Sequence, residues 1–122
     1  MSSVNYGTKR VVTGAHYGVR DWLVQRATAV LIVAFTVVVL AQLLLTKGEI
    51  SYELWAGIFA PQWMKFITAG VIVSVLWHAW VGVRNVWMDY VPAAGLRFTL
   101  QVLTIVWLVG CAAWGFEVLW RV

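Results

Sequence analysis

Three side chains that could do chemistry together lie in one stretch of the sequence, WHAWVGVRNVWMDY, from Trp77 to Tyr90. The imidazole of His78 could bind a metal ion through a ring nitrogen, or it could relay protons. The carboxyl of Asp89 and the phenol of Tyr90 could orient a polar group and exchange protons with it. Which of these reactions is open to them depends on the elements that position the three side chains.

The composition places the chain in the membrane class. Of its 122 residues 62% are hydrophobic and only 11% are charged, whereas a soluble domain carries roughly 25% charged residues. The mean hydropathy is +0.83. The chain is short enough to be one membrane-anchor domain, 1–122. The net charge of +4 does not indicate a nucleic-acid partner when most of the chain lies in lipid. The single Cys111 cannot hold an iron–sulfur cluster.

Three uncharged apolar runs are long enough to cross a bilayer, which takes roughly 20 residues. They are Ala27–Leu45, Phe66–Val83 and Phe98–Phe116. Helix is favoured over strand because in lipid each segment must satisfy its own backbone hydrogen bonds. The expected fold class is an all-α integral membrane protein with three transmembrane helices. Its expected parts are a cytoplasmic tail at 1–26 and helices at about 22–46, 62–89 and 96–120.

The basic residues that flank the spans predict the orientation. Six lie on one side and three on the other; the six are Lys9, Arg10, Arg20, Arg26, Arg84 and Arg97. The excess of positive charge faces the cytoplasm, which puts the N-terminus inside and the C-terminus outside. Between the first two spans, aromatic and aliphatic residues at near-helical spacing indicate a segment along the membrane surface; they are Tyr52, Trp55, Ile58 and Phe59. On this topology Arg26 and Asp89 are expected at similar depth.

His78 is expected near the middle of the membrane. It lies eleven residues from Asp89, or about 16 Å at 1.5 Å per residue. At about 100° per residue His78, Gly82, Asn85 and Asp89 share one helix face. Three readings of His78 stay open: an interhelical hydrogen bond, a proton relay, or a metal ligand. Gly82, one turn away, leaves room for a large flat group and so favours haem.

The sequence resembles the D-type hydrophobic membrane anchor subunits of succinate dehydrogenase, the succinate:quinone oxidoreductase of respiratory complex II. The most specific segment is HAWVGVRNVWMDYV, His78–Val91. Three other segments support the likeness, which covers nearly the whole chain: VRDWLVQRATAV at Val19–Val30, GEISYELWAGIFA at Gly48–Ala60 and LRFTLQ at Leu96–Gln101. The resemblance implies half of a heterodimeric haem-binding helical bundle, which docks the soluble subunits and passes electrons from succinate to quinone.

The resemblance also implies roles for individual residues. The family's counterpart of His78 is an axial ligand of the haem b iron, and the partner anchor donates the second axial histidine. The counterpart of Arg26 lies by the haem propionates. The counterpart of Tyr90 donates a hydrogen bond to a quinone carbonyl, and that of Asp89 lies beside the quinone.

At the start of the first span the chain departs from some of its relatives. Where those relatives have histidine before the aspartate, this chain has Arg20 followed by Asp21. A proton relay at this place is a possible role of Asp21, which follows, and of Arg20, which stands in the position of the histidine.

The implied partners are a C-type cytochrome b anchor subunit, an iron–sulfur subunit, a flavoprotein subunit and the lipid membrane. The implied cofactor is haem b and the implied substrate is ubiquinone. The implied location is the bacterial inner membrane, and the complex could form a trimer of heterotetramers. Two alternatives are a haem-free anchor of the quinol:fumarate reductase type and a small proton-translocating membrane subunit.

Overall fold

The computed structural model describes the backbone from Ala15 and the side chains from Gly18 to the last residue, Val122. Within that part every regular element is a helix, which confirms the expected fold class. The helices are α1 (Ala15–Leu45), α2 (Tyr52–Phe59), α3 (Gln62–Tyr90) and α4 (Ala94–Arg121).

Three helices are long and apolar enough to cross a membrane. These segments are Gly18–Leu45, Gln62–Tyr90 and Ala94–Arg121, with mean hydropathies of 2.7, 1.8 and 1.9. The shortest has 28 residues, about 42 Å of helix, against a hydrocarbon core roughly 30 Å thick. Each helix therefore reaches into the headgroup region, where its terminal polar side chains can meet water.

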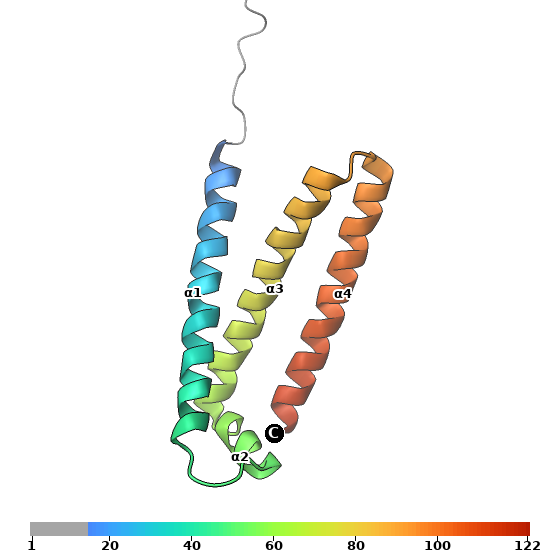
Figure 1. The fold of residues 1–122 in the computed structure, drawn as a ribbon. Coiled ribbons are helices and arrows are strands. Elements are labelled where there is room, and N and C mark those ends of the chain that lie inside the picture. The colour runs from blue at the N-terminus through green and yellow to red at the C-terminus, as the bar shows by residue number, and fades with distance from the viewer. Residues whose placement is uncertain (1–14) are drawn as a thin grey trace, which may run out of the picture.

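Helix α3 is the centre of the bundle and packs against each of the other three helices. Figure 1 shows α1 and α4 on either side of α3, with α2 across one end. The opposite end holds the start of α1, the end of α3 and the start of α4, and we call it the N-terminal end of the bundle (Figure 1). Because α1 and α3 are antiparallel, residues that come later in α1 lie beside residues that come earlier in α3.

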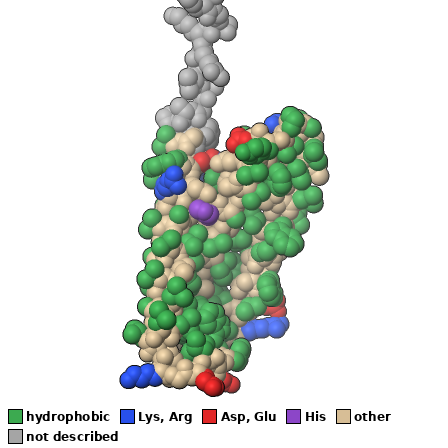
Figure 2. Space-filling view, viewed as in Figure 1, with side chains coloured by type: hydrophobic (Ala, Val, Ile, Leu, Met, Phe, Trp, Pro, Cys, Tyr) green, Lys and Arg blue, Asp and Glu red, His purple; other side chains and the backbone are tan. Residues whose placement is uncertain are grey.

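The bundle buries few side chains within itself. Among the described residues the buried apolar side chains are those of Met64, Val81 and Leu119. In each span no more than 11% of the most apolar window is buried, and hydrophobic side chains cover the visible face (Figure 2). In a membrane protein such a surface is covered by lipid or by other subunits. The three helices alone therefore form only a thin core.

Local chemistry sets the helix ends. After α1, Gly48 adopts a φ of 109°, a left-handed conformation that favours glycine. Ser51 caps α2 by accepting a hydrogen bond from the backbone N–H of Leu54 at 3.3 Å. Hydrogen bonds from its own backbone N–H and from the Ser51 hydroxyl hold the pKa of Glu53 below its usual value. Pro92 follows α3, as expected where a proline disfavours helix in the preceding residue.

The first helix begins earlier than expected. It starts at Ala15 rather than near residue 22, so part of the expected tail is helical. From residue 15 to the apolar run there is no proline, and the polar turn that contains Asp21 is held against α3 by an ion pair with Arg84. The expected surface segment contains α2.

Candidate functional site

The imidazole of His78 is held between α3 and α1. It is half-buried, and two side chains from α1 reach its two ring nitrogens. The Thr28 hydroxyl oxygen lies 3.1 Å from Nδ1, and the Gln25 amide nitrogen lies 3.4 Å from Nε2. Both ring nitrogens therefore face polar groups of the same chain, at a place where the surrounding helix surface is apolar.

Helix geometry explains why these side chains meet. Gln25 and Thr28 are three residues apart and so share a face of α1. Gly82 lies one turn from His78 on α3, and a Cβ added there would come within 3.6 Å of the Gln25 amide nitrogen. The space expected beside Gly82 for a large flat group is therefore occupied, in this chain, by the Gln25 side chain.

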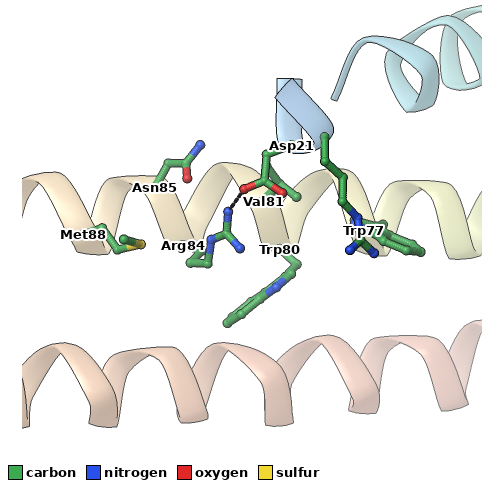
Figure 3. Close-up of a pocket in the computed structure, with 8 residues that line it drawn as sticks. Asp21, Trp77, Trp80, Val81, Arg84, Asn85 and Met88 are labelled. Atoms are coloured by element: carbon green, nitrogen blue, oxygen red, sulfur yellow. Dashed lines mark hydrogen bonds and ion pairs between the residues drawn. The ribbon is translucent and has the colours of Figure 1, made fainter. Parts of the chain in front are cut away.

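One ion pair joins α1 to α3 nearer the N-terminal end of the bundle. The Arg84 guanidinium donates a hydrogen bond to the Asp21 carboxylate, as Figure 3 shows. The two side chains are 27% and 31% exposed, so water screens the pair only in part. Arg84 Nε is buried and has no hydrogen-bond partner among the described residues.

Two cavities flank this ion pair. The larger measures about 600 Å³ and is lined by Arg20, Asp21 and Arg84 together with Trp77, Trp80 and Met88 (Figure 3). The smaller measures about 300 Å³, and its lining includes Asp21, Trp22, Gln25 and Arg26. Asn85 borders both. Polar groups from α1 and α3 thus line both cavities beside the ion pair.

Arg26 lies deeper in the bundle than the sequence predicted. Asp21 pairs with Arg84 and Gln25 contacts His78, so Arg26 is level with the His78 turn of α3 and not with Asp89. The prediction of equal depth was wrong because α1 starts earlier and continues past the ion pair. The guanidinium of Arg26 lies 5.6 Å from the centre of the Trp22 ring, a cation–π contact.

Asp89 and Tyr90 lie apart from the histidine. Both are exposed at the end of α3, Tyr90 by 80%, and neither lines the two cavities described above. The structure therefore brings His78, Arg26, Asp21 and Arg20 toward one region between α1 and α3. It leaves Asp89 and Tyr90 facing outward, where a ligand would have to be enclosed by another subunit.

The residues around His78 fit a haem that is shared with another chain. In the described part of the chain no three His, Cys, Asp or Glu side chains are grouped as a metal site, so His78 would act as a single ligand. Among the described residues the polar neighbour of its Nε2 atom is the Gln25 amide, whose buried Oε1 has no hydrogen-bond partner there. A side chain bonded so incompletely can move aside at little cost. Arg26, whose guanidinium reaches back toward Trp22, could pair with an acidic edge of the group.

Three residues of this site were missed by the sequence interpretation: Gln25, Thr28 and Arg84. Arg84 had been counted only as a flanking positive charge, and Asp21 had been considered only with Arg20 as a possible proton relay. The available signal was the spacing of Asp21, Gln25 and Thr28, which lie on one face of α1 at intervals of four and three residues. Their partners on α3 depend on the relative depth of the two helices, which the sequence alone did not determine.

The comparisons with known proteins agree with this architecture. Residues 5–112 match the family of succinate dehydrogenase/fumarate reductase transmembrane subunits. The chain is also 43% identical, over 103 residues, to the succinate dehydrogenase hydrophobic membrane anchor subunit of Coxiella burnetii. That match covers 84% of this chain and 89% of the relative.

The three long apolar helices define a multi-pass membrane protein. The chain belongs to the succinate dehydrogenase/fumarate reductase transmembrane subunit family, as a membrane anchor subunit of succinate dehydrogenase. It is thus part of an oxidoreductase complex that includes flavoprotein and iron–sulfur subunits.

Proposed function

We propose that this anchor subunit holds one side of a haem b and one wall of a ubiquinone site, and so carries electrons from succinate to quinone. The observation that carries the proposal is His78, a half-buried imidazole within a membrane span whose Nε2 atom has the Gln25 amide as its polar neighbour among the described residues. Ionisable groups at such depth are costly in lipid and mark functional sites.

His78 would bind the haem iron through one ring nitrogen, and a C-type cytochrome b anchor subunit would donate a second histidine ligand. Arg26 would pair with the propionates through a charge-assisted hydrogen bond. The chemistry that haem b supplies when bound is one-electron transfer within the membrane. This chain would contribute His78 as an iron ligand, the packing that orients the imidazole ring, and the positive charge of Arg26 beside the haem propionates.

Tyr90 and Asp89 would form part of the quinone site. The phenol would donate a hydrogen bond to a quinone carbonyl, and the nearby carboxylate would hold protons for a reaction that takes up two. Their exposure at the end of α3 is suited to a site completed by the neighbouring subunits. Asp21 and Arg20, which line the larger cavity, are candidates for a proton route from the aqueous side.

The proposed location is a bacterial inner membrane, with the N-terminal end of the bundle facing the cytoplasm and the soluble subunits. Protease added to spheroplasts should leave a tag at the N-terminus intact and remove one at the C-terminus. The opposite result would reverse the orientation and with it the proposed docking side.

The test of the function is purification of the complex through a tag on this chain. The dithionite-reduced minus oxidised spectrum should show a b-type α-band, and the co-purifying chains should include a flavoprotein, an iron–sulfur protein and a second small membrane protein. The same partners without haem would indicate a haem-free anchor. Proton flux through the chain alone in liposomes would instead favour a proton-translocating subunit. A trimeric mass of the complex would establish the trimer of heterotetramers.

A further inference from the structure

A buried hydroxyl lies against the imidazole at the centre of the site. Thr28 is one of two buried polar or charged residues in the described part of the chain, with 8% of its surface exposed. Its Oγ1 atom lies 2.6 Å from the backbone carbonyl oxygen of Val24 and 3.2 Å from that of Gln25. The same oxygen lies 3.1 Å from His78 Nδ1. Three neighbours thus compete for one hydroxyl.

The single proton of that hydroxyl decides the hydrogen-bond pattern. Two oxygens approach to 2.6 Å only when a proton lies between them, so the hydroxyl donates to the carbonyl of Val24. This is the usual bond of a helical threonine to the carbonyl four residues earlier. With its proton committed, the Thr28 oxygen can only accept from His78, and Nδ1 must be the nitrogen that carries hydrogen.

A neutral imidazole has one N–H and one lone pair. If Nδ1 carries the hydrogen, the lone pair is on Nε2, which faces the amide nitrogen of Gln25 at 3.4 Å. An amide N–H is a donor, so this second contact agrees with the first. Both neighbours on α1 therefore favour the same tautomer of His78.

We infer that Thr28 is a positioning residue that fixes His78 in the Nδ1–H tautomer, so that Nε2 is the one nitrogen available to bind iron. This inference rests on the proposed haem function and goes beyond it by assigning the group that orients the ligand. A hydrogen bond from the far nitrogen makes a ligating imidazole more electron-rich, and loss of such a partner typically lowers metal affinity about 10- to 100-fold.

The test compares Thr28→Val, which removes the hydroxyl but keeps nearly the same shape, with Thr28→Ser, which keeps the hydroxyl. In the purified complex Thr28→Val should weaken haem binding about tenfold and raise the haem midpoint potential, because a less electron-rich ligand stabilises ferric iron less. Thr28→Ser should restore both properties toward the wild-type values. A haem content and potential unchanged in Thr28→Val would overturn the inference, as would equal losses in both variants, which would indicate packing alone.

A second readout does not need haem. Nitrogen-15 NMR of the histidine-labelled full chain in lipid nanodiscs reports which ring nitrogen of His78 carries hydrogen, with His16→Gln removing the other histidine signal. We expect Nδ1–H in the wild-type chain and a loss of that preference in Thr28→Val. If Nε2–H predominates, the inference fails. A complex without haem in which Nδ1–H still predominates would refute the proposed haem function and leave only the assignment of the tautomer standing.

Discussion

At the scale of single residues, the chemistry of the site depends on what surrounds each ionisable group. The sequence predicted a functional His78 from its place in an apolar run, but it could not say which side chains reach the ring. Those contacts come from Thr28 and Gln25, about 50 residues away in the sequence. A hydroxyl on an apolar helix has the same sequence pattern whether it bonds only to its own backbone or also to a neighbouring helix. Contacts of this kind therefore require the packed structure.

The exposed tyrosine at the end of α3 supports one prediction. Tyr90→Phe should slow quinone reduction by the complex about fivefold, because one net hydrogen bond is worth about 1 kcal/mol. Reduction of an artificial dye at the soluble subunits should be unchanged. Tyr52→Phe is the matched control, since Tyr52 is similarly exposed (74%) but lies on α2 at the other end of the bundle. Equal quinone rates in Tyr90→Phe and wild type would remove Tyr90 from the quinone site.

At the scale of helices, the length and spacing of the apolar runs predicted the three spans well. The α3 bounds expected at about 62–89 differ by one residue from Gln62–Tyr90. The start of α1 was placed too late because charged residues such as Arg20 and Asp21 were read as marking a tail outside the helix. A transmembrane helix can continue past the hydrocarbon core when its polar turn finds a partner, as Asp21 does in Arg84.

That ion pair should help to hold α1 against α3. Arg84→Gln should lower the free energy of unfolding of the full chain by about 1–2 kcal/mol, a value between those of exposed and buried pairs. The measurement is an SDS titration in mixed micelles. Arg121→Gln is the control, because Arg121 pairs with Glu117 on one exposed helix face, at 76% and 55% exposure, and such pairs contribute at most about 0.5 kcal/mol. Equal losses in both variants would mean that the Asp21–Arg84 pair has no special role.

At the scale of the whole molecule, the thin core is the feature that connects fold and function. With only Met64, Val81 and Leu119 buried among the apolar residues that the structure describes, the chain keeps most of its hydrophobic surface for lipid and for other subunits. The proposed haem with one ligand from this chain, and the proposed quinone site at Asp89 and Tyr90, would both be half-sites that agree with such a surface. The class of protein could be read from composition and spans, whereas the depth of Arg26 relative to His78 depended on how far α1 extends.

The most direct test of the central proposal, that His78 binds the haem iron, is the spectrum of the His78→Ala complex. The visible difference spectrum and the low-temperature EPR spectrum of the oxidised complex report haem content and axial ligation. We expect His78→Ala to lose or alter the low-spin haem signal, and His16→Ala, which changes the other histidine of the chain, to leave it intact. An unchanged low-spin haem signal in His78→Ala would contradict the assignment of His78 as the ligand.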